Sequence, residues 1–378
     1  MDKNSNIELI KEESETYSDD AIFNISSYGA DLSFRELISM YQENELEKPE
    51  LQRHYVWDKK EASRFIDSIL LGLPVPSIFL AKTSDERRLI IDGYQRIMTV
   101  FDFVQKGIFG GDGKKFTLSN SEIINEKWRG KCFDELSELE KRKIRNTSIH
   151  AIIFEQKSPQ NDTAMYQIFE RINTAGRTLR PQEIRNCVEH GRFNEVLIDI
   201  NKNNKNWRKI FSKDKKTDSR MGDVELILRM YAMSYIKHFD VFYKTQLNLN
   251  KYLNEFMNKN KKMEFIDECE LRNSFEEIMN FFADHFDVTK LFRNETQKKS
   301  KSKKINPAIL DSIFASTHFV LKHYNSLNQY GLLTENYSKL IENEDYQTVI
   351  SQRTTNLDNI RLRIKLATRI LYGVEYEW

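Results

Sequence analysis

The chain has 378 residues, of which 39% are hydrophobic and 30% are charged. This length predicts two domains, or one domain with a large appendage. Its 58 basic and 57 acidic side chains leave a net charge of +1. That balance excludes a uniformly basic nucleic-acid binder but permits a local basic face. Three well-separated cysteines (Cys132, Cys187 and Cys269) and the lack of an apolar run of membrane-spanning length predict a cytoplasmic protein with no membrane partner.

The first half of the chain predicts short strands and helices after an acidic, aperiodic tail over residues 1–20 that is expected to be mobile. In chain order, the expected elements are a strand over 21–26, helices over 33–43 and 61–71, strands over 77–80 and 89–91, a helix over 94–104, a strand over 116–118, a helix over 133–145 and a strand over 149–154. The strands over 77–80 and 89–91 are expected to be antiparallel neighbours. The pattern predicts an α+β domain over residues 21–158.

The second half, residues 159–378, shows almost only helical periodicity and predicts an all-helical domain. The expected helices cover residues 162–173, 181–191, 221–238, 242–257, 265–286, 308–327 and 359–374. A basic loop is expected near residues 296–305, and its lysines are Lys298, Lys299, Lys301, Lys303 and Lys304. Such a run either contacts DNA phosphates or is only a solvated loop.

The stretch from Arg88 to Val104 is the most informative part of the sequence. An apolar, β-branched run ends at Asp92 and Gly93, and helical spacing begins at Tyr94. Asp92 is expected to cap the helix. Gly93 is expected to let the backbone turn sharply and to let a ligand come close. A strand that turns into a helix in this way presents free backbone N–H groups, which attract anions.

Gln95 and Arg96 lie in the first turn of that helix. An arginine there opposes the helix dipole, and a sequence that breaks a local rule often marks a site. A phosphate is the natural partner of Arg96 and of the free N–H groups. The alternative is that Arg96 pairs with Asp92 in an ordinary strand–turn–helix. The spacing alone leaves both interpretations open.

Two further segments combine cationic, amide and aromatic side chains. Arg53, Tyr55 and Trp57 lie in an irregular segment whose pattern suits stacking on a base or clamping a backbone. Arg171 and Asn173 fall at an expected helix end, where they suit contact with a phosphate or a base. The alternatives are that the aromatic residues fill the core and that the second segment is a helix C-cap.

A metal-dependent nuclease, which would use Glu155 and Lys157 or the Asp92 turn, is a weaker alternative. Glu155 and Lys157 lie two residues apart at the end of an expected strand, as an acid and a lysine often do in such enzymes, but this pattern is common by chance. The seven histidines are scattered and form no metal-binding pair at helical spacing, and no nucleophile motif is present. The sequence therefore predicts no protein-bound metal.

Five segments in order resemble the GmrSD-type restriction endonuclease N-terminal domain family, which belongs to the ParB/sulfiredoxin-like superfamily. They cover residues 51–57, 68–76, 91–96, 169–173 and 181–186. The family usually has Asp-Gly-Gln-Gln-Arg where this chain has Asp92 to Arg96, so Tyr94 replaces a glutamine. Arg180 stands where a serine often caps the helix that begins at Pro181. The chain shows no motif of the HNH nucleases that often accompany the family.

The resemblance implies a ParB/sulfiredoxin-like nucleotide-binding domain with a small mixed sheet over 21–158, followed by the helical domain. It further implies a nucleoside triphosphate hydrolase that acts with Mg²⁺ as the sensor or regulator of an anti-phage DNA-restriction system. DNA and a partner nuclease would be its partners, and a homo-oligomer is left open. The alternative is a non-catalytic nucleotide- or DNA-binding module. The implied catalytic residues are Asp92, Gln95 and Arg96, and the implied nucleotide-binding residues are Arg53, Tyr55, Trp57, Gly93, Tyr94, Arg171 and Asn173.

Overall fold

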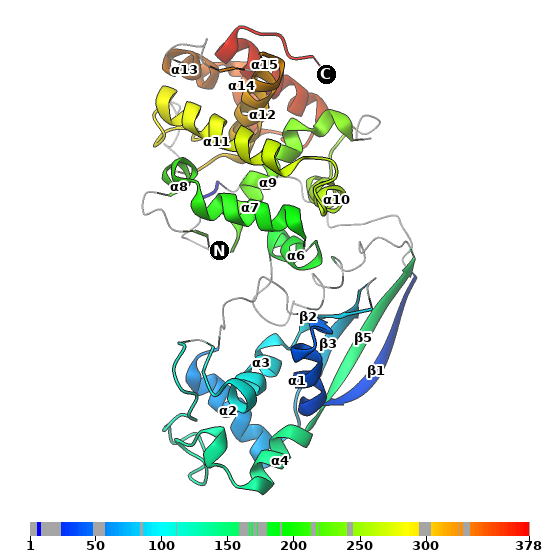
Figure 1. The fold of residues 1–378 in the computed structure, drawn as a ribbon. Helices are drawn as coiled ribbons and strands as arrows, with labels where there is room; N and C mark the ends of the chain where they lie inside the picture. The colour runs from blue at the N-terminus through cyan, green and yellow to red at the C-terminus, as the bar shows by residue number, and fades with distance from the viewer. Residues whose placement is uncertain are drawn as a thin grey trace. The chain divides into compact units, whose positions relative to one another are not determined.

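The computed structural model describes residues 6–8, 24–47, 57–83, 86–110, 112–158, 166, 168, 172, 180–189, 191–212, 217–218, 220–239, 245–294, 304–324, 326–327 and 333–377. The chain divides into two compact units (Figure 1). The sheet unit comprises Asp19–Leu179 and Asn186–Val188, and the helical unit comprises Met1–Ser18, Arg180–Arg185 and Glu189–Trp378.

The sheet unit is built on a five-stranded sheet with the strand order β1-β5-β3-β4-β2. The strands are β1 (Asn24–Ser33), β2 (Leu46–Glu47), β3 (Ile78–Lys82), β4 (Arg88–Asp92) and β5 (Ser148–Ser158). β1 pairs antiparallel with β5, and β3 pairs antiparallel with β4, whereas β5 runs parallel to β3 and β4 runs parallel to β2. The expected α+β class, the small mixed sheet and the antiparallel β3–β4 pair are confirmed.

Local capping sets the ends of the helices in this unit, which are α1 (Phe34–Gln42), α2 (Lys59–Leu71), α3 (Tyr94–Phe101) and α4 (Glu138–Asn146). Ser33 and Glu36 form the expected capping box at the start of α1. Gly72 ends α2 in the left-handed conformation, with φ of 82°. α3 continues into one turn of π-helix, Asp102–Lys106, so the helical stretch runs slightly beyond its expected end.

Two of the elements expected in the sheet unit are interrupted or absent. The helix expected over 133–145 is interrupted, because the hydroxyl and backbone of Ser137 form a capping box with Glu140 and start α4 there, after a short 3₁₀ turn (Phe133–Glu135). The strand expected over 116–118 does not form. The Phe116 and Leu118 N–H groups donate to Gly107 O and Lys131 O, so both residues belong to a folded loop and not to the sheet.

One face of the sheet packs against the helices and forms the core of this unit. The inward side chains of the central strands are buried hydrophobic residues, with at most 2% of their surface exposed: Ile78, Leu80, Ile90, Ala151 and Ile153. Ile97 and Val100 of α3 join the same cluster. Because the strand before the Asp92 turn and the helix after it share one core, the turn is held on a rigid base.

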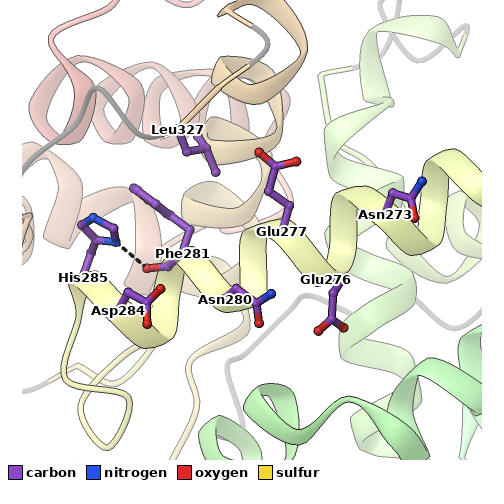
Figure 2. Close-up of a pocket in the computed structure, with 8 residues that line it drawn as sticks. All are labelled: Asn273, Glu276, Glu277, Asn280, Phe281, Asp284, His285 and Leu327. Atoms are coloured by element: carbon purple, nitrogen blue, oxygen red, sulfur yellow. Dashed lines mark hydrogen bonds between the residues drawn. The ribbon is translucent and has the colours of Figure 1, made fainter.

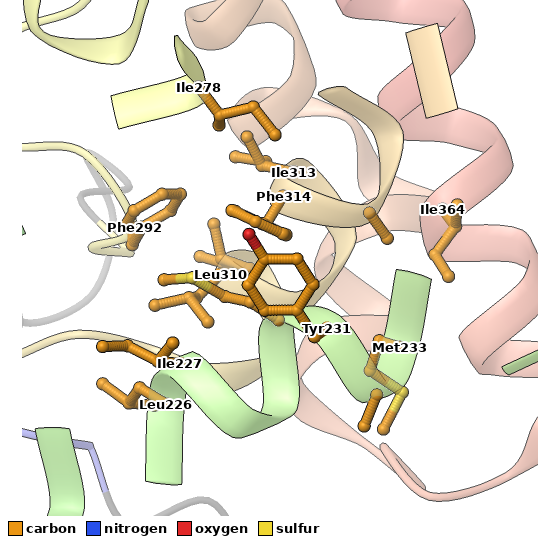
Figure 3. Packing of buried hydrophobic residues seen from close by; sticks show 14 of the residues in the cluster. Leu226, Ile227, Tyr231, Met233, Ile278, Phe292, Leu310, Ile313, Phe314 and Ile364 are labelled. Carbon is orange, nitrogen blue, oxygen red and sulfur yellow. The ribbon is translucent and has the colours of Figure 1, made fainter. Parts of the chain in front are cut away.

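The helical unit consists of α6 (Pro181–Val188, of which Pro181–Arg185 belong here), α7 (Arg192–Asn203), α8 (Lys205–Phe211), α9 (Gly222–Ser234), α10 (Leu249–Asn260), α11 (Glu268–His285), α12 (Pro307–Tyr324), α13 (Thr334–Glu342), α14 (Glu344–Ser351) and α15 (Leu357–Tyr372), with a 3₁₀ turn at Ile236–His238. Helix α12 is buried from Pro307 to Val320, and it packs against α9 and α15. Figure 3 shows this core, where Tyr231 of α9 lies beside Phe314 of α12. The helical character expected for the second half is confirmed.

Several helix boundaries differ from the sequence expectation. α10 begins at Leu249 and not at residue 242, because Asn248 caps it through its side chain. Four helices, α7, α8, α13 and α14, were not expected from the sequence. The helix expected over 162–173 lies largely outside the described residues.

Residues 6–8 of the expected tail bond to residues next to α12. Ile7 pairs with Ile305, the Glu8 N–H donates to Ile305 O at 2.8 Å, and Asn306 Nδ2 donates to Glu8 Oε2 at 3.1 Å. These backbone bonds attach residues 6–8 next to α12, and the mobility of the tail stays a prediction. Other parts of the tail lie outside the described residues. No helix within the described part of the chain is long and apolar enough to cross a membrane.

Candidate phosphate site at the Asp92 turn

The turn between β4 and α3 depends on Gly93. Its φ of 100° is in the left-handed region, and a Cβ built at this position would lie 2.3 Å from Ile78 Cγ2 of the neighbouring strand. Glycine is thus required here by the backbone conformation and by the packing against β3. These two structural reasons explain the glycine without the expected approach of a ligand. Gly93 is also the N-cap of α3, and no side chain caps this helix.

The expectation that Asp92 caps α3 is wrong, because the carboxylate of Asp92 instead accepts a hydrogen bond from Arg96. Arg96 Nη2 donates to Asp92 Oδ2 at 2.5 Å. Arg96 Nη1 donates to Pro76 O at 2.8 Å and to Ser77 O at 2.6 Å. One guanidinium thus fastens the proline-rich connector before β3 to the turn after β4. The pairing of Arg96 with Asp92, which the sequence left as an alternative, is present.

These bonds do not use all the donors at the turn. Among the described residues, no partner accepts from Arg96 Nε–H or from the second Nη2 proton, and Asp92 retains one free carboxylate oxygen. The Arg96 side chain is 15% exposed and that of Asp92 is 40% exposed. The first backbone N–H groups of α3 lack acceptors within the helix. Gly93 and Tyr94 at the start of α3 are buried, so Arg96 and Asp92 are the partly exposed groups at the positive end of the helix dipole.

Trp57 is brought to this turn, although 38 residues separate it from Gln95. The Trp57 backbone N–H donates to Gln95 Oε1 at 3.4 Å, and the indole ring packs edge-on against Phe65 at 5.5 Å. The structure therefore places Trp57, Gln95 and Arg96 around the same turn. Arg53 and Tyr55, which were expected to join them, lie outside the described residues.

Tyr94 lies in the hydrophobic core, with 6% of its surface exposed. Burial raises the pKa of its hydroxyl well above the usual value, and the proximity of Tyr41 and Asp102 raises it further. This placement argues against the expected contact between the Tyr94 side chain and a nucleotide. A sequence comparison with the family motif shows only that a glutamine has been replaced, and not which way the new side chain points.

The other expected ligand residues have no described position. Arg171 and Asn173 lie outside the described residues, as do Lys298, Lys299, Lys301 and Lys303 of the basic loop. Lys304 is described, and it is partly exposed beside Ile305, which pairs with Ile7. The proposed pocket partners of Arg96 and the proposed DNA contact of the loop therefore stay predictions.

Of the two residues of the nuclease alternative, Glu155 forms a surface ion pair with Lys82 and not with Lys157. Glu155 Oε1 lies 3.2 Å from Lys82 Nζ, which also contacts Glu86 at 2.8 Å. Hydrogen bonds to Glu86 and Glu155 raise the pKa of Lys82. Lys157 is exposed. Within the described residues, no group of three His, Cys, Asp or Glu side chains is arranged to hold a metal ion.

Arg185 of the 181–186 motif has a structural role that the sequence did not show. Its side chain is fully buried, and its Nε donates to Asn254 Oδ1 at 2.8 Å. Nη1 donates to Gln182 Oε1 at 3.0 Å and to Glu225 Oε2 at 2.9 Å, and Nη2 donates to Asn250 Oδ1 at 2.8 Å. This arginine fastens α6 to α9 and α10. No local pattern reveals it, because its partners on those two helices lie 40 to 69 positions away.

A hollow of about 350 Å³ lies on α11 of the helical unit (Figure 2). Its lining side chains are Asn273, Glu276, Glu277, Asn280, Phe281, Asp284, His285 and Leu327. Glu276 accepts from Asn204 Nδ2 at 2.7 Å, and Asn280 accepts from Asn206 Nδ2 at 2.9 Å. These acidic and amide groups link α11 to the region of α8, and the hollow contains none of the site residues expected from the sequence.

The Asp92 turn belongs to a recognisable domain. Residues 34–188 match the family model described as the GmrSD restriction endonuclease, N-terminal domain. This part of the chain therefore belongs to that family, and the resemblance carried by the sequence motifs is confirmed. The family description connects the domain with DNA restriction, which suggests a restriction-system component. A search of curated proteins and a search of solved structures each gave no match.

Proposed function

We propose that the chain binds and hydrolyses a nucleoside triphosphate at the Asp92 turn and thereby acts as the sensor or regulator of a DNA-restriction system. The observation that carries the proposal is the partly exposed guanidinium of Arg96, whose Nε–H has no described acceptor and which is fixed beside the N-terminus of α3 in a domain of the GmrSD N-terminal family. A phosphate chain supplies the acceptors that these oriented donors lack.

The hydrogen bonds of Arg96 to the proline-rich connector before β3 prepare its guanidinium to bind phosphate. Two backbone carbonyls, those of Pro76 and Ser77, hold Nη1, so the guanidinium is oriented before an anion arrives. Nε–H has no described acceptor and shares one edge of the planar group with Nη2, which is the edge that forms bidentate contacts with phosphate. In hydrolysis this contact stabilises negative charge as it develops on the transferred phosphoryl group.

Gln95 and Asp92 complete the proposed chemistry. The Gln95 amide, held near the Trp57 backbone, positions the attacking water or binds a phosphate oxygen. Asp92 keeps Arg96 aligned and offers its free oxygen toward the solvent. Mg²⁺ bound with the nucleotide would neutralise phosphate charge, and it is commonly held by phosphates with one or two carboxylates, which agrees with a single accessible aspartate.

A phosphate-release assay with each nucleoside triphosphate, with and without DNA, tests this function. The wild type is expected to release phosphate, and Arg96→Ala is expected to lose about a hundredfold in turnover. Arg129→Ala is a matched control, because Arg129 also donates to backbone carbonyls, those of Ile124 and Glu122, in the same unit. Equal losses in the two variants would show that a general loosening of loops, and not a phosphate contact, explains the effect.

Two outcomes would replace the proposed function with one of its alternatives. Tight nucleotide binding with no phosphate release would indicate a non-catalytic switch module. Nicking of plasmid DNA by the chain alone in Mg²⁺ or Mn²⁺, abolished by Glu155→Gln, would indicate a metal-dependent nuclease. DNA as a partner, and a separate nuclease that cuts it, follow from the restriction-system family and are part of the same proposal.

A further inference from the structure

Strand β1 is a long strand at the edge of the sheet. It covers ten residues, Asn24–Ser33, and β5 is its only neighbour in the strand order. Figure 1 shows it at the outer margin of the sheet. At the end of the strand the Ser33 N–H donates to Glu36 Oε2, and from Asn24 to Leu32 no described residue outside β5 bonds to the backbone of β1. An edge of this kind is a template for pairing with another strand.

The side chains of β1 do not protect this edge. Folded proteins usually place lysines, prolines or central bulges on an exposed edge to prevent pairing. β1 contains neither lysine nor proline, and its only register irregularity is at the first residue pair, Asn24 and Ile25. Its one charged residue, Asp31, is paired with His150 at 2.8 Å. Ile25 and Tyr28 are 38% and 46% exposed, so apolar surface is also available.

We propose that β1 pairs antiparallel with β1 of a second copy of this chain, with Tyr28 on the two-fold axis. The register centred on Tyr28 keeps all described residues from Asn24 to Leu32 in the ladder. It places Tyr28 opposite its own copy, which is a favourable cross-strand aromatic pair. Ser27 lies opposite Gly29, so small residues flank the two tyrosines.

The charge on the strand favours a second copy over a charged partner. In this register Asp31 lies opposite Ile25 of the other chain, so no like charges meet, and each strand is otherwise uncharged. A strand from a basic or acidic protein would find only Asp31 to recognise, and that carboxylate is already paired. The two-fold contact is closed, because each edge is used once, and it joins two five-stranded sheets into one.

The pairing leaves the Asp92 turn uncovered. In the strand order β1-β5-β3-β4, the turn follows β4, three strands in from the edge. At the usual strand spacing this is about 14 Å. The dimer and the proposed phosphate site are therefore separable, and each can be tested without disturbing the other.

Sedimentation equilibrium of the full chain up to about 100 µM tests the pairing, because weak specific dimers populate in this range. The wild type is expected to dimerise. Tyr28→Lys and Tyr28→Glu, measured separately, each place like charges on the axis and are expected to weaken the dimer by about tenfold or more. Mixing the two variants pairs lysine with glutamate and is expected to restore dimers. Leu139→Lys and Leu139→Glu are matched controls, because Leu139 is 77% exposed on α4, away from β1, and these variants are expected to dimerise as the wild type does.

Cross-linking locates the axis independently. Tyr28→Cys is expected to form a disulfide-linked dimer under mild oxidation, because directly opposed strand residues lie within disulfide range. Leu139→Cys, with the native cysteines present in both variants, is expected not to cross-link beyond the wild-type level. A wild type that stays monomeric throughout this concentration range would overturn the proposal. So would a dimer that both charged variants at position 28 leave unchanged.

Discussion

The two units each contain an arginine that joins three segments of chain, and their surroundings differ. Arg185 of the helical unit is fully buried, and carboxylate and amide side chains surround its guanidinium. Arg96 of the sheet unit is partly exposed, donates two of its three hydrogen bonds to backbone carbonyls, and has an Nε–H with no described acceptor. When side chains accept all the hydrogen bonds of an arginine, as for Arg185, the arginine has a structural role. When backbone carbonyls orient the guanidinium and it stays partly exposed, as for Arg96, it is available to a ligand.

The largest effect, a loss of stability, is expected from replacing Arg185, the buried arginine. Arg185→Ala leaves Glu225, Asn250 and Asn254 without their cation, and loss of one partner in such a buried network costs about 3–5 kcal/mol. Thermal unfolding followed by circular dichroism should show a large drop in Tm. Arg185→Lys should not restore it, because one ammonium cannot reach all these acceptors. An unchanged Tm would contradict the structural role given to Arg185.

Gly93→Ala is expected to be the next largest change. It forces a Cβ into Ile78 and places alanine at a φ of 100°, which together cost about 2–4 kcal/mol. Gly107→Ala is the matched control, because Gly107 has a φ of 63° and a Cβ built there has nothing within 4 Å. The control should lose only about 1 kcal/mol in free energy of unfolding. Similar losses in both variants would mean that packing against β3 does not shape the turn.

The units are also expected to respond to acid at different pH. His318 of α12 is fully buried beside Tyr231 and Phe314, and burial lowers its pKa to about 3, with Lys322 nearby contributing further. Because its folded-state pKa lies below that of the unfolded chain, about 6.5, unfolding takes up a proton between these values. Stability should therefore fall as pH falls from about 6.5 toward 3. Melting curves of His318→Phe should be flatter than those of the wild type over this range, and parallel curves would contradict the assignment.

Glu140 of the sheet unit should give a smaller effect at lower pH. Burial raises the pKa of its carboxyl, but hydrogen bonds from Lys127 and Ser137 outweigh burial and hold the pKa at about 2. The folded pKa is below the unfolded value, about 4.3, so this contribution is present above that value and is lost as pH falls toward 2. Glu140→Gln should remove this part of the acid sensitivity, whereas the exposed Glu126→Gln should not. The difference between the two variants in Tm against pH is the measurement.

The sequence predicted the parts of the fold that depend on neighbouring residues. The Ser33 capping box, the stop at Gly72 and the strand–turn–helix at Asp92 are all encoded within a few positions. It did not predict which partner Arg96 would bond, because backbone carbonyls such as that of Pro76 have no signature in a sequence. Tyr94 illustrates a second limit, since the hydrophobic cluster that buries it includes Leu37 and Ile38 of α1, more than 50 positions earlier in the sequence.

The central claim is that the guanidinium of Arg96 binds phosphate, and calorimetry tests it most directly. A non-hydrolysable nucleoside triphosphate with Mg²⁺ would be titrated into wild type, Arg96→Ala and Arg129→Ala, with a thermal melt of each protein. Loss of a charge-assisted contact, about 2–3 kcal/mol, should weaken binding by Arg96→Ala roughly a hundredfold while the protein stays folded. Arg129→Ala should bind as the wild type does. Equal affinities of the wild type and Arg96→Ala would leave the Asp92 turn as a structural junction alone.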